Sequence, residues 1–271
     1  MLGGLAATSA CSVTPGSAGA DDVVTVRYSY GAGASQFAEL TTPPGSERLP
    51  VVVVVHGGYW RAAYGLELGV PPAVDLARRG YAALNVEYRR VGDGGGWPQT
   101  GQDLAGAVAG LATEGQRLSG GRLDLDHVVG LGHSAGGQLT GWLAAQQDAE
   151  VPLAGVVLQA GVLDLVQAAQ QSLGAGAVDD FLGGSPTAIP DVYADASPIA
   201  LVPLDIPSVC VHGTEDTLVP LEQSQRFVAA ARAAGGAAEL RTCPGDHFAP
   251  ITVGSEAWAL CLAAVADLSR R

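Results

Sequence analysis

The chain has 271 residues, of which 48% are hydrophobic and 15% are charged. This composition supports a large buried core and excludes a protein that is disordered through most of its length. The formal net charge is −13 and every basic residue is arginine, so no lysine is present to form a Schiff base or a phosphate-binding P-loop. The acidic balance, without a basic stripe, also argues against nucleic-acid binding.

Residues 1–20 carry no charge and consist mostly of small residues, and two hypotheses fit them. They form either a flexible leader or the remnant of a bacterial lipoprotein signal that is cleaved before Cys11 and acylated there. Thr8 stands where such signals have a larger aliphatic residue, and a positive region and an adequate apolar run are missing. A cytoplasmic protein and an exported protein with a lipid anchor at Cys11 therefore remain alternatives. No apolar run of about 18 residues predicts a transmembrane segment elsewhere.

Residues 21–271 are predicted to form one α/β domain, because short β-branched runs alternate with longer stretches rich in Ala and Leu. The eight predicted strands are 23–29, 36–41, 50–56, 81–87, 127–132, 154–160, 207–212 and 238–243. The predicted helices are 71–79, 101–118, 135–147, 222–234 and 255–269. The first two strands alternate polar and apolar residues, which predicts an antiparallel edge, whereas Val51 to Val55 should form a central strand of a mostly parallel sheet.

The segment from about 166 to 206 interrupts this alternation. It contains four prolines and is too long for a simple connection, so we expect a small cap insertion over a site. Cys210 and Cys243 lie in two of the predicted strands. A disulfide is possible if those strands are neighbours, and two buried free thiols are the alternative.

Residues 132–136 read Gly-His-Ser-Ala-Gly, which fits the G-x-S-x-G pattern of a nucleophile elbow. An apolar run precedes this pentapeptide and a helix of small residues is predicted after it, so the sharp strand-to-helix turn that the motif needs is expected here. The pattern predicts Ser134 as a catalytic nucleophile, with the start of the helix aimed at a developing oxyanion.

Residues 56–60 read His-Gly-Gly-Tyr-Trp and follow the apolar Val51 to Val55 run directly. Consecutive glycines at the carboxyl end of a strand allow backbone N–H groups to point into a crevice. The predicted oxyanion hole therefore consists of N–H groups from Gly57, Gly58 and Tyr59, together with that of Ala135.

A serine hydroxyl needs an imidazole base, and that imidazole needs an acid to orient it. His247 lies between the last predicted strand and the last predicted helix, where the base stands in the chain order Ser, Asp, His. The turn after the preceding strand offers Glu215 and Asp216 as the acid. No pair of residues has convincing metal-ligand spacing, and no dinucleotide-binding glycine motif follows the first strand, so no metal and no cofactor are predicted.

Over residues 23–269 these motifs make the chain resemble the α/β-hydrolase superfamily. The HGGYW segment is similar to the HGGxW motif of kynurenine formamidases, and also to the HGG loop of hormone-sensitive-lipase-like bacterial esterases. The segment HGTEDTLVP resembles the family turn in which the second acid orients the base, which favours Asp216 and leaves Glu215 as the reserve. The resemblance implies an α/β-hydrolase fold and a Ser134–His247–Asp216 triad.

Aromatic side chains gather in the loops that are predicted at the carboxyl edge of the sheet, which suggests an apolar substrate pocket. The residues expected to line it are Trp60, Tyr64, Trp97, Phe181 and Phe248. The leading hypothesis is a hydrolase of small carboxylic esters that works through an acyl-enzyme. The alternatives are an arylformamidase acting on N-formylkynurenine and a catalytically silent α/β-hydrolase that serves as a binding module.

Overall fold

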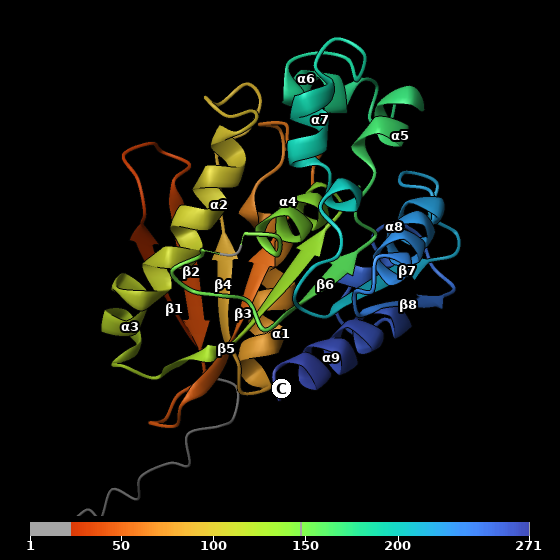
Figure 1. The fold of residues 1–271 in the computed structure, drawn as a ribbon. Coiled ribbons are helices and arrows are strands. Elements are labelled where there is room, and N and C mark those ends of the chain that lie inside the picture. The colour runs from red at the N-terminus through yellow and green to blue at the C-terminus, as the bar shows by residue number, and fades with distance from the viewer. Residues whose placement is uncertain (1–22, 147, 271) are drawn as a thin grey trace, which may run out of the picture.

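The computed structural model describes residues 23–146 and 148–270, which form an eight-stranded sheet with helices on both faces (Figure 1). The spatial order of the strands is β1-β2-β4-β3-β5-β6-β7-β8. Strand β2 pairs antiparallel with both β1 and β4, and the remaining pairs are parallel. The predicted antiparallel edge and mostly parallel sheet are therefore confirmed. The strands are β1 (Val24–Ser29), β2 (Phe37–Thr42), β3 (Leu49–Val55), β4 (Ala82–Val86), β5 (Leu123–His133), β6 (Gly155–Gln159), β7 (Ser208–Gly213) and β8 (Ala238–Cys243).

Two hydrophobic cores lie on opposite faces of this sheet. Along the buried valine run of β3, Val51, Val53 and Val55 belong to one core, and Val52 and Val54 belong to the other. A strand alternates its side chains between the two faces, so a run of five valines serves both cores at once. The helices α2 (Gln99–Ala109), α4 (Ala135–Leu143) and α8 (Glu222–Ala233) cover the first face, and α1 (Val70–Arg78) and α9 (Glu256–Leu268) cover the second.

The predicted helix over residues 101–118 is wrong, because the chain breaks it into α2, a short 3-10 helix (Gly110–Ala112) and α3 (Glu114–Ser119). The break lies where Gly110 packs against the ring of Tyr28. A Cβ atom at position 110 would lie 2.7 Å from a carbon of that ring. The hydroxyl of Tyr28 also donates a hydrogen bond of 2.6 Å to the carbonyl of Ala107. The contact with the edge strand β1 therefore falls at the point where the helix ends, and helical periodicity does not reveal it.

The segment predicted as a cap forms three short helices, α5 (Leu165–Gln170), α6 (Ala177–Leu182) and α7 (Pro190–Ala196), which lie at the top of Figure 1. The loop between α5 and α6 lies against the loop that follows β3. The guanidinium of Arg61 is 3.2 Å from Asp180 and 3.4 Å from the carbonyl of Ala175, and a Cβ atom on Gly174 would meet the ring of Tyr59 at 2.3 Å. The cap and the HGGYW loop are thus in direct contact.

Cys210 and Cys243 are buried free thiols. Their strands are neighbours, but Cys210 pairs with Leu240 and Cys243 pairs with Gly213. The two side chains belong to the cores on opposite faces of the sheet, so the sheet itself separates them. The leader hypothesis and the proposed anchor at Cys11 concern residues outside the described ones. Among the described residues, no helix has the length and apolar character needed to cross a membrane.

Candidate active site

Ser134 occupies the sharp turn between the end of β5 and the start of α4. Its backbone has φ 55° and ψ −116°, a region that a non-glycine residue adopts only when its surroundings enforce it. The Ser134 N–H donates to the carbonyl of Gln159 at 2.8 Å, which fixes the turn to the neighbouring strand β6. A Cβ atom on Gly136 would come within 2.2 Å of the carbonyl oxygen of Val55, so only glycine permits this approach of α4 to β3. The turn has the geometry of a nucleophile elbow.

His247 and Asp216 form a hydrogen-bonded pair. Nδ1 of His247 donates to Oδ2 of Asp216 at 2.6 Å, and Oδ1 of Asp216 accepts the backbone N–H groups of Leu218 and Val219 at 2.8 and 2.9 Å. Burial raises the pKa of Asp216, but hydrogen bonds from His212, His247 and the Val219 backbone outweigh burial and lower this pKa well below its usual range. Asp216 is therefore a carboxylate at neutral pH. Glu215, the reserve acid, is exposed.

Ser134 and His247 line one cavity of about 230 Å³. The wall also includes Phe248 beside His247 and Leu218 beside Asp216, so the loops that carry His247 and Asp216 also form its apolar sides. The complete lining is Gly58, Tyr59, Tyr64, Leu68, His133, Ser134, Leu218, His247 and Phe248. The three predicted triad positions, from the ends of β5, β7 and β8, thus converge at the carboxyl edge of the sheet.

The loop after β3 brings backbone N–H groups beside Ser134. A Cβ atom on Gly57 would lie 2.9 Å from the Cβ of Ser134, which shows how closely this loop passes the nucleophile turn. Gly58, Tyr59 and Trp60 follow with φ values of 114°, 54° and 54°. In the part of the chain that the structure describes, the N–H groups of Gly58 and Tyr59 have no hydrogen-bond partner. Ala135 opens α4, where the first N–H groups also lack partners within the helix.

His56 fixes this loop through a hydrogen bond and through ring stacking. Its Nδ1 donates to the carbonyl of Gly57 at 2.7 Å, and its ring stacks on Tyr88 with 4.3 Å between ring centroids. The Tyr88 hydroxyl donates to the carbonyl of His56 at 2.7 Å, and a carboxylate oxygen of the buried Glu87 lies 3.3 Å from Nε2 of His56. These contacts indicate that His56 braces the loop by hydrogen bonding.

Of the five aromatic residues predicted to line the pocket, Tyr64 and Phe248 do so. The other three do not line this cavity. Trp60 is buried, stacks on Phe181 with 4.5 Å between ring centroids and donates from Nε1 to Gln138 at 3.0 Å. Trp97 packs edge-on against Phe181 and donates to Asp195 of the cap. Packing in the core removes more of the surface of these three rings from water than lining the cavity would. In that position the rings join the cap to the rest of the domain.

Two histidines beside the predicted triad were not assigned to the site from the sequence. Nε2 of His133 donates to the backbone carbonyl of His247 at 2.9 Å, and His212 lies 3.2 Å from Oδ2 of Asp216. Both stand at the carboxyl end of a parallel strand, His133 on β5 and His212 on β7. Their position at the end of a strand is the feature of the sequence that could have assigned them to the site.

His133 provides a pH-dependent test of this arrangement. Burial, followed by the neighbouring His247, lowers the pKa of His133 to about 3. In the unfolded chain this pKa is about 6.5, so only the unfolded state takes up this proton between these values. His133 therefore stabilises the fold fully above pH 6.5, and the free energy of unfolding should fall by about 1.4 kcal/mol for each pH unit below it.

Urea unfolding of the wild type and of His133→Gln between pH 4.5 and 7.5 measures this contribution. The substitution should reduce the slope of unfolding free energy against pH, whereas His127→Gln, at a partly exposed ring paired with Asp124, serves as the matched control. An unchanged slope in His133→Gln would contradict the assignment of His133 as a buried neutral imidazole.

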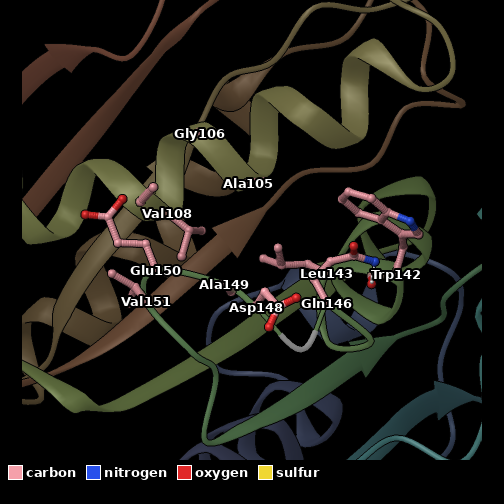
Figure 2. Close-up of a pocket in the computed structure, with 11 residues that line it drawn as sticks. Ala105, Gly106, Val108, Trp142, Leu143, Gln146, Asp148, Ala149, Glu150 and Val151 are labelled. Carbon is pink, nitrogen blue, oxygen red and sulfur yellow. Dashed lines mark hydrogen bonds between the residues drawn. The ribbon is translucent and has the colours of Figure 1, made fainter.

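A wider cavity of about 440 Å³ lies between α2 and the end of α4 (Figure 2). Its wall includes Trp142, Leu143 and Val151 with the carboxylates Asp148 and Glu150, and none of the triad positions. Within residues 23–146 and 148–270, no group of three or more His, Cys, Asp or Glu side chains is arranged to hold a metal ion. The smaller cavity is lined by Ser134 and His247, and Asp216 is hydrogen-bonded to His247 behind its wall.

Comparisons with known proteins agree with this architecture. The BD-FAE family model matches residues 39–230, which include Ser134 and Asp216 and end before His247. Two proteins of Mycobacterium tuberculosis are similar in sequence. "Esterase LipC" is 29% identical over 199 residues, covering 68% of this chain and 48% of that protein. "Probable carboxylic ester hydrolase LipM" is 28% identical over 193 residues, covering 66% and 44%. The chain thus spans about half the length of these curated relatives.

Solved structures match nearly the whole chain. Esterase B from Lactobacillus rhamnosis superimposes with a TM-score of 0.77 at 25% identity, over 92% of this chain and 87% of that one. A bacterial heroin esterase gives a TM-score of 0.73 at 22% identity, over 94% and 86%. These neighbours and the strand order show that the fold is the α/β-hydrolase fold.

Proposed function

Because this chain belongs to the BD-FAE family, we propose that it is a serine hydrolase that cleaves small carboxylic esters through an acyl-enzyme. One observation carries the proposal: Ser134 lines a cavity together with His247, whose other ring nitrogen is bonded to Asp216 at 2.6 Å. A strained serine, an imidazole and a buried carboxylate in this order are the components of nucleophilic acyl transfer. The names of the two mycobacterial relatives support the ester class over the formamide class.

In the first half of the proposed reaction, Oγ of Ser134 attacks the acyl carbon, and Nε2 of His247 takes the hydroxyl proton. The carbonyl oxygen becomes an oxyanion that accepts hydrogen bonds from the N–H groups of Ala135 and of Gly58 or Tyr59. When the ester C–O bond breaks, His247 returns the proton to the departing alkoxide, which leaves as an alcohol. Asp216 keeps the Nδ1–H tautomer of His247 and stabilises its protonated form.

In the second half, a water molecule takes the place of the alcohol. His247 removes a proton from the water as it attacks the acyl carbon. The tetrahedral intermediate then collapses, its C–Oγ bond breaks, and the proton passes from His247 to Oγ of Ser134. The products are a carboxylic acid and the restored enzyme, so water is the only co-substrate that the mechanism needs.

The size and lining of the cavity favour a substrate with a small, uncharged acyl group. Its volume of about 230 Å³ lies below the range typical of drug-sized ligand pockets, and its walls include Leu68, Leu218 and Phe248. The similar esterase B was solved with a tributyrin phosphonate inhibitor, which is a short-chain ester analogue. The net charge of −13 also disfavours an anionic substrate.

The experiment that tests the proposal compares kcat/KM for 4-nitrophenyl acetate, butyrate and octanoate with kcat/KM for N-formylkynurenine. We expect the two short esters to be the best substrates and Ser134→Ala to lower their turnover steeply. A higher kcat/KM for N-formylkynurenine would identify an arylformamidase that uses the same machinery. The absence of turnover on every substrate would favour the binding-module alternative.

A further inference from the structure

His212 lies at the carboxyl end of β7 with its side chain fully buried, directly behind the acid of the proposed triad. Its Nε2 is 3.0 Å from the carbonyl oxygen of Val219 and 3.2 Å from Oδ2 of Asp216. On the other side of the ring, Nδ1 is 2.8 Å from the hydroxyl of Ser224 in α8. Both ring nitrogens are therefore engaged.

These partners determine the protonation of the ring. The Val219 carbonyl can only accept, so Nε2 carries a hydrogen and donates it to that carbonyl, and the Asp216 carboxylate is a second, longer contact of the same N–H group. In the neutral ring, Nδ1 is then an acceptor, and the Ser224 hydroxyl donates to it. Oδ2 of Asp216 thus faces two imidazoles, accepting from His247 at 2.6 Å and lying 3.2 Å from Nε2 of His212, while Oδ1 accepts two backbone N–H groups.

We propose that His212 is a positioning residue for the hydrolytic reaction, and that it orients the Asp216 carboxylate toward His247 through the chain Ser224–His212–Asp216. The inference rests on the proposed function, because it assigns a role relative to the triad. The second donor on Oδ2 restricts rotation of the carboxylate and spreads its negative charge. His247 then faces a carboxylate oxygen of Asp216 that is held in one orientation and carries less negative charge.

Removing the donor has two consequences. The carboxylate gains freedom to turn, so His247 is less often aligned with Ser134 and kcat falls. The charge on Asp216 is also less compensated, so it stabilises the protonated form of His247 more strongly. The acid limb of the pH profile of kcat/KM should therefore shift to higher pH.

Other titratable groups face this cluster and remain in place in the variants below. His133 approaches from β5, and its pKa is affected by His247, Asp216 and His212. Tyr59 lies in the loop after β3, and burial, followed by the charge of Asp216, raises its pKa. Cys210 lies on β7, close to Ser224 of α8. Burial raises the pKa of Cys210 to about 12, so it stays a neutral thiol.

The test compares His212→Asn with His212→Gln. The Asn amide reaches the position of Nδ1, near Ser224, but is too short to reach Asp216, whereas the Gln amide reaches the position of Nε2 and can donate to the carboxylate. We expect Asn to lower kcat roughly tenfold, the effect of losing one hydrogen bond to a charged group, with KM little changed. The acid limb of the pH profile of kcat/KM for His212→Asn should move to higher pH by roughly half a pH unit.

His212→Gln should restore both kcat and the pH profile toward the wild type, and His127→Gln is the matched control for a histidine outside the site. Titration with a fluorophosphonate gives the competent fraction of each preparation, so a loss of folded protein is separated from a change in rate. Wild-type kcat and pH profile in His212→Asn, or no recovery in His212→Gln, would overturn the proposal. A wild-type protein that neither labels nor turns over esters would instead overturn the proposed function.

Discussion

Replacing Ser134 by alanine should lower kcat on 4-nitrophenyl acetate by about 1,000- to 1,000,000-fold, the range expected when a nucleophile is removed and oxyanion stabilisation remains. The substitution removes only the hydroxyl, and the strained backbone stays held by the bond from Ser134 N–H to Gln159. KM should change much less than kcat, because the walls of the cavity are preserved. Steady-state kinetics over a range of substrate concentrations measures both parameters.

Ser185→Ala is the matched control for this substitution, because Ser185 lies in the cap and its hydroxyl contacts only Thr187 among the described side chains. Its kcat should equal that of the wild type. If Ser134→Ala retained more than a tenth of the wild-type kcat, Ser134 would not be the nucleophile. Thermal unfolding of both variants shows whether they are folded.

Replacing Asp216 by asparagine should lower kcat by roughly 10,000-fold, because an amide next to Nδ1 favours the wrong tautomer of the base. In the wild type, Nδ1 of His247 donates to Oδ2, so Nε2 is free to accept the serine proton. An amide that donates to Nδ1 places the hydrogen on Nε2 and removes the acceptor. The loss should appear in kcat measured at pH 7 to 8 with 4-nitrophenyl acetate.

Glu215→Gln is the control for this second substitution, since the two acids are adjacent in sequence but Glu215 is exposed. It should leave kcat within about twofold of the wild type, as expected of a surface change away from the reacting groups. The roles would have to be exchanged if Glu215→Gln produced the large loss and Asp216→Asn did not.

Much of the fold could be predicted because its signals are local. The run of Val51 to Val55 is apolar at every position, which indicates a central strand that serves two cores, and the structure places it between β4 and β5. The pentapeptide around Ser134 is equally local, because a strand, a sharp turn and a helix of small residues follow one another without interruption. Glycine at position 136 is required by the 2.2 Å approach to Val55, which the motif already implies.

The environment of the site was harder to predict because it depends on contacts between distant segments. Trp60 follows the glycine loop directly, yet its ring turns inward onto Phe181, more than one hundred residues later in the chain. Helix periodicity across residues 101–118 likewise gives no sign of the contact between Gly110 and Tyr28. The position of a loop side chain depends on which apolar surface of the rest of the fold it covers.

The choice of acid shows where sequence information stops. Glu215 and Asp216 are neighbours, and only the turn decides which of them reaches His247. In the structure, Oδ1 of Asp216 accepts the N–H groups of Leu218 and Val219, which ties the side chain to its own turn and leaves Oδ2 for the histidines. The shorter side chain suits this local bonding, as it does in Asx-turns generally.

The most direct measurement of the central claim is the position of a covalent adduct after treatment with a fluorophosphonate, read by peptide mass spectrometry. We expect one adduct per chain, on the hydroxyl of Ser134, formed at a rate that drops sharply in His247→Ala. A label on a different side chain, or equal labelling rates with and without the imidazole of His247, would contradict the claim that these groups act as one catalytic unit.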